Sequence, residues 1–201
     1  MSQDLKNIAK FAHQFLYTMQ PKRCFWAKPG NPLYIRYHDE EWGRPVHDDR
    51  HLLEMLILES FQAGLTWECV LNKREAFREA FRGFDRDSII AFDDSDIERL
   101  MGNPSIIRNR AKIRAAIANT RVFKEIQSEY GSFDAYLATF CPDAPLRDHT
   151  STVSPWSDAI SADLRRRGMK FLGSTIIHAF LQAIGIIDAH EPSCFLHHNS
   201  K

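Results

Sequence analysis

The sequence LLEMLILESFQAGLTW, residues 52–67, contains one of the most apolar runs in the chain, and Glu59 follows that run directly. Counted along a helix, Leu52, Met55, Leu56 and Glu59 fall at positions i, i+3, i+4 and i+7, so they share one face. A carboxylate that points where leucines point is costly to bury, and it needs a partner. That partner is either structural, such as an arginine or a helix N-terminus, or a ligand.

Start and stop signals along the rest of the chain predict one helix after another. Ser95 and Glu98 have capping-box spacing, and Ser154 precedes a proline at a first helical position. The expected helices cover about residues 50–62 (capped by Asp48-Asp49), 66–81, a short segment from Ser95, a long segment after Pro104-Ser105, 132–139, 155–167 and 174–185, with a loop at 141–153. Only Leu33–Tyr37 has a strand-like pattern, so we expect an all-α fold.

Composition limits the class of protein. The chain has 201 residues, with 26 Lys+Arg against 26 Asp+Glu, so it lacks a strongly basic character, although a local basic face remains possible. It contains no apolar run of about 18 residues, and its first twenty residues do not have the pattern of a signal peptide. We therefore expect a cytoplasmic protein with no membrane partner and with reduced cysteines. The first twenty residues instead carry a helical stripe that we expect to pack on the domain or on a neighbour: Ile8, Phe11, Ala12, Phe15, Leu16 and Met19.

Cysteine and histidine occur together near both ends of the chain, as Cys24-x13-His38 and as His190-x3-Cys194. Two cysteines and two histidines are the composition of a closed structural zinc site, which here would join the two chain ends. The separation of the two pairs is far longer than in a zinc finger. The alternative is two buried thiols with two surface histidines, and His197 and His198 are competing ligands.

The segment CFWAKPGNPLYIRYHDEEW, residues 24–42, is rich in tyrosine and tryptophan. Ordinary core packing is one explanation for these rings. Together with Trp67 and Glu59 they could instead line a pocket. Aromatic walls stack on flat bases, and a carboxylate attracts a cation and accepts hydrogen bonds from an exocyclic amine. The guest that suits such a pocket best is a cationic purine.

Five stretches in this order resemble the 3-methyladenine DNA glycosylase I family: CFWAKPGNPLYIRYHDEEWGRP, LESFQAGLTW, IIRNRAKIRA, SPWSDAISADLRRRGMKFLGSTI and the terminal His190…Cys194. The resemblance spans residues 24–194 and implies a repair enzyme of the helix-hairpin-helix superfamily. It divides the chain into an N-terminal helical extension, 1–23, and a glycosylase domain, 24–201. It implies one structural Zn²⁺ held by Cys24, His38, His190 and Cys194. In the base pocket it implies Glu59 and Tyr37 as hydrogen-bonding groups and Trp67 as the stacking ring, with Trp26 and Tyr34 nearby.

The same resemblance implies contacts to double-stranded DNA. Leu65, with the backbone of Gly64, would fill the gap left by a flipped base, as apolar wedges do in other DNA-binding proteins. The segment Met101–Arg110 lacks the glycine-rich hairpin expected in the superfamily. Phosphate contacts would then come from two basic sets, unless these are solvated helix faces: Arg108, Arg110, Lys112 and Arg114, and Arg165–Arg167 with Lys170.

The implied reaction is hydrolysis of the N-glycosidic bond of 3-methyladenine in DNA, which leaves an abasic site. The lesion is cationic in DNA and leaves as a neutral base, so recognition and positioning can do most of the work. Glu59 is the catalytic candidate, because it favours the cationic lesion over neutral adenine. No lysine nucleophile is implied, and we expect a monomer. Two alternatives are a zinc-stabilised helical DNA-binding module without catalysis and a hydrolase with a catalytic zinc.

Overall fold

The computed structural model describes residues 21–142 and 145–197, and within them the fold is almost entirely helical. The elements are α2 (Pro32–Glu40), α3 (Asp49–Gln62), α4 (Trp67–Leu71), α5 (Arg74–Ala80), the 3₁₀ turn η1 (Arg82–Phe84), α6 (Arg86–Ile90), α7 (Asp94–Gly102), α8 (Arg110–Tyr130), α9 (Phe133–Ala138), α10 (Pro155–Arg166) and α11 (Ser174–Ala183). Two short strands, β1 (Leu146–Arg147) and β2 (Ile187–Asp188), pair in parallel. This architecture confirms the predicted all-α class. None of the described helices is long and apolar enough to cross a membrane.

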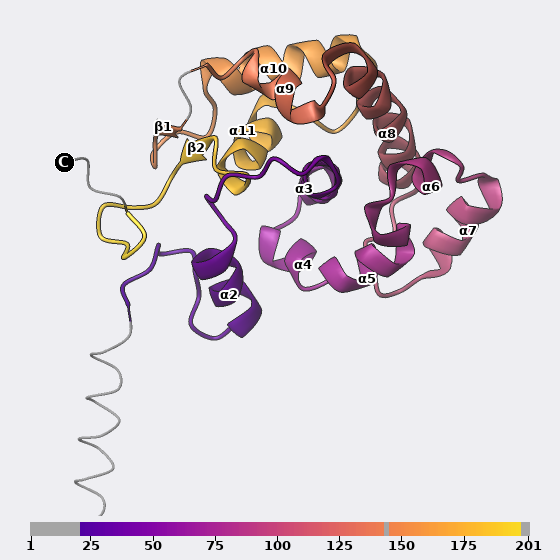
Figure 1. The fold of residues 1–201 in the computed structure, drawn as a ribbon. Coiled ribbons are helices and arrows are strands. Elements are labelled where there is room, and N and C mark those ends of the chain that lie inside the picture. Colours follow the sequence, from indigo (N-terminus) through magenta and orange to yellow (C-terminus); the bar gives the residue numbers. More distant parts are fainter. Residues whose placement is uncertain (1–20, 143–144, 198–201) are drawn as a thin grey trace, which may run out of the picture.

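Helix α3 is the central element of the fold (Figure 1). It begins where the Asp48 carboxylate accepts a hydrogen bond from the backbone N–H of His51 at 2.8 Å. Every residue from 52 to 61 is buried, and the helix packs against α4, α8, α9 and α11. A helix that is buried all round is a core helix rather than a surface one. The predicted face that includes Glu59 is therefore only one of several buried faces.

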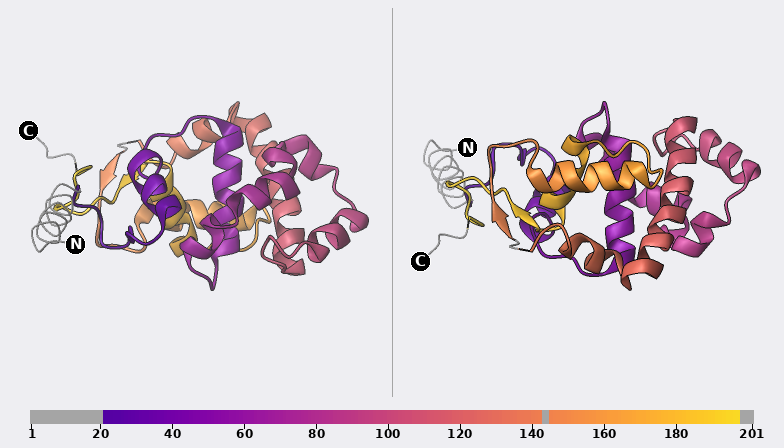
Figure 2. Two further views of the ribbon diagram at one scale, coloured as in Figure 1. Left: turned by 90° about the horizontal axis from the view of Figure 1, so that it is seen from below. Right: turned by 90° about the horizontal axis from the view of Figure 1, so that it is seen from above.

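The described part of the molecule is elongated, and different elements lie at its two ends (Figure 2). Helices α6 and α7 lie at one end, while the strands and the described ends of the chain lie at the other. There the backbone N–H of Phe195 donates to the carbonyl of Lys22 at 2.8 Å, so the two ends of the described part of the chain meet. The predicted helical stripe within residues 1–19 lies outside the described residues.

Several predicted helix boundaries are confirmed. The Ser154 side chain caps α10 in a reciprocal capping box with Ser157, and Pro155 occupies the first helical turn. Beyond α10 the chain turns at Gly168, whose φ of +100° suits glycine. Helix α11 then begins at Ser174, as predicted.

The strand-like interpretation of Leu33–Tyr37 is wrong, because these residues belong to α2. The side-chain oxygen of Asn31 accepts hydrogen bonds from the backbone N–H groups of Leu33 and Tyr34, and Pro32 occupies the first helical position. Both features are strong helix-start signals that outweigh the β-propensity of the aromatic and branched residues. The capping chemistry, visible in the sequence as Asn-Pro, decides the local structure.

Three other boundaries differ from the prediction. The segment expected as one helix over 66–81 forms two, α4 and α5, with a turn at Asn72. Helix α8 begins at Arg110 under an Asn109 cap rather than directly after Pro104-Ser105. The reciprocal cap of α7 uses Asp93 and Asp96, slightly ahead of the predicted Ser95 and Glu98.

Candidate functional site

A cavity of about 150 Å³ lies where α2, α3, α4 and α11 meet. Engineered cavities of about this volume bind a benzene ring. The cavity is lined by Trp26, Tyr34, Tyr37, Trp42, Glu59, Gln62, Trp67, Ala179 and Gln182. The structure therefore brings together all five residues that the sequence assigned to a base pocket.

The aromatic wall is a continuous set of contacting rings. The centroids of Tyr37 and Trp67 are 5.4 Å apart, and those of Trp26 and Tyr34 are 5.1 Å apart. Trp42 meets Trp26 edge to face at 4.8 Å. These are favourable aromatic geometries, so the wall is held in place by its own packing.

Glu59 is the central charged group of this cavity. Its side chain comes from the last turn of α3 and is 3 % exposed. Among the described residues its Oε2 has no hydrogen-bond partner. Burial raises the pKa of Glu59 to about 8. A structural ion pair would have lowered that pKa, so the structure does not support the structural explanation for this carboxylate.

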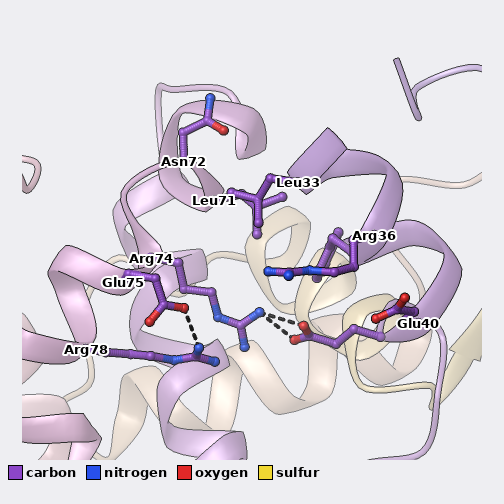
Figure 3. Close-up of a pocket in the computed structure, with 10 residues that line it drawn as sticks. Leu33, Arg36, Glu40, Leu71, Asn72, Arg74, Glu75 and Arg78 are labelled. Atoms are coloured by element: carbon purple, nitrogen blue, oxygen red, sulfur yellow. Dashed lines mark hydrogen bonds and ion pairs between the residues drawn. The ribbon is translucent and has the colours of Figure 1, made fainter. Parts of the chain in front are cut away.

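Glu54, five residues earlier on the same helix, shows what a structural carboxylate looks like here. It accepts hydrogen bonds from Nε of Arg74 at 2.6 Å and from Nε of Arg78 at 2.8 Å. Arg74 also binds Glu41, so the charges are mutually compensated. Arg74 and Arg78 line a second cavity, which Figure 3 shows. In it the guanidinium groups of both arginines are paired with carboxylates. Both arginines thus have partners, whereas Oε2 of Glu59 in the aromatic cavity has no partner among the described residues.

Two more buried polar atoms in the aromatic cavity have no partner among the described residues. They are the amide oxygen of Gln62 and the indole Nε1 of Trp67. Buried polar atoms are nearly always hydrogen-bonded, so the three atoms mark a place in the cavity for a ligand or ordered water. Gln62 lies three residues after Glu59, on the same helical face, and that spacing could have identified it.

Tyr37 supplies a neutral hydroxyl to the same cavity. Its pKa lies well above the ordinary value, first because of burial and then because of the negative charges of Glu59 and Glu41. Burial also raises the pKa of Tyr34 to about 12. Both phenols therefore remain protonated at neutral pH and can donate a hydrogen bond.

A second cluster joins the two chain ends. The ligand atoms of Cys24, His38 and Cys194 all lie within 4.8 Å of one another, and all three residues are buried. His190 is the neighbour of this group, with its ring centroid 5.5 Å from that of His38. Its Nε2 is buried and has no partner among the described residues. A Cβ at Gly43 would lie 2.7 Å from Cε1 of His190, so glycine is required there.

Each histidine of the cluster is oriented by a carboxylate. Nδ1 of His38 lies 2.8 Å from Oδ1 of Asp39, and Nδ1 of His190 lies 2.8 Å from Oδ1 of Asp188. A carboxylate at Nδ1 fixes each ring and is the usual surrounding of a histidine that binds a metal through Nε2. Nε2 of His38 lies 3.4 Å from Sγ of Cys194 and 3.4 Å from the backbone N of Cys24. Cys24, His38 and Cys194 together could hold a metal ion, and His190 lies beside this group without belonging to it.

The predicted DNA contacts fall into exposed and buried groups. Gly64 is exposed with a φ of +78°, and Leu65 is 44 % exposed. Arg108 and Lys170 are exposed, and the side chain of Arg110 pairs with Glu98.

Lys112 differs from the other predicted phosphate contacts, because its side chain is turned inward. It is 6 % exposed, and its Nζ donates to the carbonyls of Phe61 at 2.8 Å and Ala63 at 2.6 Å. These are orphan carbonyls at the C-terminal end of α3, where a cation is favourable. The charge pattern predicts that Lys112 contacts phosphate, whereas its hydrogen bonds show that it holds the backbone just before the turn that carries Leu65.

Comparisons with known proteins place the chain in one family. A model of the methyladenine glycosylase family matches residues 26–197. The chain is 39 % identical over 186 residues to DNA-3-methyladenine glycosylase 1 of Escherichia coli K12, covering 90 % of this chain and 99 % of that protein. It is 36 % identical over 178 residues to DNA-3-methyladenine glycosylase of Haemophilus influenzae, covering 86 % and 96 % of the two chains.

Solved structures give the same result. A crystal structure of 3-methyladenine DNA glycosylase I superposes with a TM-score of 0.84 at 42 % identity, covering 88 % of this chain and 100 % of that chain. A structure of the Staphylococcus aureus enzyme, described as the structural basis of 3-methyladenine recognition, superposes with a TM-score of 0.83 at 34 % identity and covers 88 % and 98 %. On the family match and on these relatives, the chain belongs to the methyladenine glycosylase family.

Proposed function

We propose that this protein hydrolyses the N-glycosidic bond of 3-methyladenine in DNA, releases the free base and leaves an abasic site. The observation that carries the proposal is the group of three unpartnered polar atoms, on Glu59, Gln62 and Trp67, inside one aromatic cavity. The names of the relatives support it, and so does a solved relative in complex with 3-methyladenine. The activity belongs to the first steps of DNA base-excision repair.

The cavity residues suit a cationic adenine ring. Trp67 stacks on the base, the Tyr37 hydroxyl donates a hydrogen bond, and Glu59 accepts one from the exocyclic amine. A cationic lesion stabilises the ionised form of Glu59, so its binding lowers the pKa of this carboxyl from about 8. Neutral adenine offers no such compensation. Discrimination thus comes from charge, and it is strengthened by the low-dielectric surroundings of the site.

Departure of the base needs little further chemical help. The methylated ring is already positively charged, so it leaves as a neutral molecule and water completes the hydrolysis. No lysine or cysteine is among the described residues that line the cavity, so we expect no covalent enzyme–sugar intermediate and no strand cleavage. The enzyme's contribution is to extract the base, hold it and stabilise its charge.

The turn between α3 and α4 and the turn between α10 and α11 suit the DNA-facing side of the pocket. Leu65 on the first turn is the wedge that fills the space of the flipped base. On the second turn, Gly173 caps α11 without a side-chain hydrogen bond, which leaves N–H groups that favour phosphate, and Lys170 is exposed beside it. We infer that α10, this glycine-containing turn and α11 form the helix-hairpin-helix element that Met101–Arg110 lacks.

We propose that Cys24, His38, His190 and Cys194 hold one structural Zn²⁺. Four protein ligands leave no open position for a substrate, which argues against the hydrolase with a catalytic zinc. The ion would also support the base pocket. The His38 ring lies 5.1 Å from Trp26, and the His190 ring lies 4.7 Å from Trp42, so the ligands pack directly behind two rings of the pocket wall.

The experiment that tests the function is incubation of the protein with methylated duplex DNA, followed by chromatographic identification of the released bases. We expect free 3-methyladenine and an intact but alkali-labile strand. A DNA-binding module without catalysis would bind the duplex and release nothing, and that result would refute the proposal.

Binding of free 3-methyladenine depends on the aromatic wall. We expect Trp67→Ala to weaken it by about 1–3 kcal/mol, the scale of one base stack. Tyr37→Phe removes one neutral hydrogen bond and should weaken binding by about 0.5–1.5 kcal/mol. Isothermal calorimetry measures both effects, with Trp156→Ala on α10, outside the pocket lining, as the control. Parent-like affinity of Trp67→Ala would mean that the base binds elsewhere.

A further inference from the structure

Phe171, on the turn between α10 and α11, has an unusual backbone for its residue type. Among the described residues, three that are not glycine have positive φ, and Phe171 is one of them, at +60°. Phe84 is another, but its ring is buried in the core against Phe81. Phe171 as a residue is 38 % exposed, so core packing does not explain its conformation. Backbone strain of this kind persists only where the surroundings impose it, and it is common at functional sites.

Two buried side chains from different helices impose the conformation of this turn. Asn119 of α8 donates to the carbonyl of Lys170 and accepts from its N–H, both at 2.9 Å. The Ser161 hydroxyl of α10 donates to the carbonyl of Leu172 at 2.7 Å. The backbone of the residue on each side of Phe171 is therefore held by a buried side chain.

The turn that carries Phe171 lies close to the turn that carries Leu65, because Lys112 contacts both. The Nζ of Lys112 lies 5.9 Å from the centroid of the Phe171 ring. That ammonium also donates to the carbonyls of Phe61 and Ala63, just before the turn that exposes Leu65. One buried lysine thus joins the two turns, and each turn presents an exposed apolar side chain, at 44 % and 38 %.

We propose that Phe171 is a second apolar contact to the bases of duplex DNA, and that it packs on a base step beside the nucleotide that Leu65 replaces. The inference rests on the proposed function, because it assumes that these two turns meet DNA. Its chemistry fits a base step, since aromatic rings stack on bases of any sequence and DNA-bending proteins insert phenylalanine between bases. The exposed cation of Lys170, the preceding residue, suits the flanking phosphate.

The test compares Phe171→Ala, Phe171→Leu and Phe171→Gly with the parent and with Val153→Ala, a control at another exposed apolar side chain. Affinity for a duplex containing a stable abasic-site analogue is measured by fluorescence anisotropy. Phe171→Ala should bind this duplex about tenfold more weakly, the order of one lost stack. Phe171→Leu should retain most of the affinity. Phe171→Gly should bind as weakly as Phe171→Ala yet melt at least as high as the parent, because glycine accepts a positive φ.

Two further measurements separate this contact from a structural role. Binding of free 3-methyladenine should be unchanged in all three variants. A 2-aminopurine placed beside the abasic site should report less perturbed stacking with Phe171→Ala than with the parent. Parent-like DNA affinity of Phe171→Ala overturns the inference, and so does an equal loss of free-base binding. If the parent releases 3-methyladenine from DNA in either case, the proposed function stands. A parent that neither binds the duplex nor releases base overturns both.

Discussion

Replacing Glu59 by glutamine is expected to slow release of 3-methyladenine from methylated DNA at least about tenfold, which corresponds to about 1.4 kcal/mol. Glutamine keeps the shape of the side chain but removes its charge and places an amide donor where an acceptor is needed. A hydrogen bond to a charged group contributes about 1.5–3 kcal/mol, and an amine facing a donor adds to the loss. Single-turnover base release measures the effect.

The same variant should fold at least as well as the parent, because an unpartnered carboxyl is no longer buried. The pH dependence of the free energy of unfolding gives a more specific test. The pKa of Glu59 is about 8 in the folded protein, against an ordinary value of 4.5. The folded state thus holds a proton that the unfolded state releases, so this carboxyl stabilises the fold below about pH 4.5 and that contribution is lost as the pH rises to about 8. Chemical denaturation between pH 5 and 9 should show this decline in the parent and not in Glu59→Gln.

Glu54→Gln is the matched control on the same helix. Glu54 compensates Arg74 and Arg78, so its neutralisation removes one of the two carboxylates that pair with the buried guanidinium of Arg74. The control should melt lower and, once folded, retain base release per active molecule. If Glu59→Gln behaves in this way instead, with a lower melting point and full excision, Glu59 is a structural residue and the proposed pocket chemistry is wrong.

The parts of the fold that the sequence predicts are those decided locally. The cap at Ser154 and the central helix over residues 49–62 follow from side chains adjacent in the chain. The strand prediction at Leu33–Tyr37 fails because β-propensity is a weaker signal than an Asn-Pro helix start. The predicted start of α8 is displaced because Asn109 competes with Ser105 as a cap, and only the path of the turn decides between them.

The site residues likewise fall into those that local sequence predicts and those that only tertiary packing brings together. Glu59 and Gln62 share a helix face, so their meeting is a matter of spacing, whereas Gln182 reaches the cavity only because α11 packs on α3. Lys112 shows the limit of charge patterns. Its neighbours in sequence are basic, but its ammonium binds the carbonyls of residues 51 and 49 positions away, and no pattern in one chain predicts that contact.

Loss of a cysteine ligand is expected to destabilise the fold strongly. Cys194→Ala should lose the bound Zn²⁺ and lower the free energy of unfolding by several kcal/mol. Zinc binding contributes about 10–16 kcal/mol in small fingers, and a larger helical core stands partly on its own. The matched control is Cys141→Ala, which removes a buried thiol outside the metal cluster and so reports the effect of a small cavity alone.

Metal analysis should find one zinc per chain in the parent, and a strong chelator should reproduce the Cys194→Ala melting curve. Chelation should also weaken binding of free 3-methyladenine, because His38 and His190 pack behind Trp26 and Trp42 of the pocket wall. A structural ion acts through this wall and carries no water that exchanges with solvent. Detection of such a water on the metal, or full excision with unchanged melting after complete removal of zinc, would show that the four residues do not form a closed structural site.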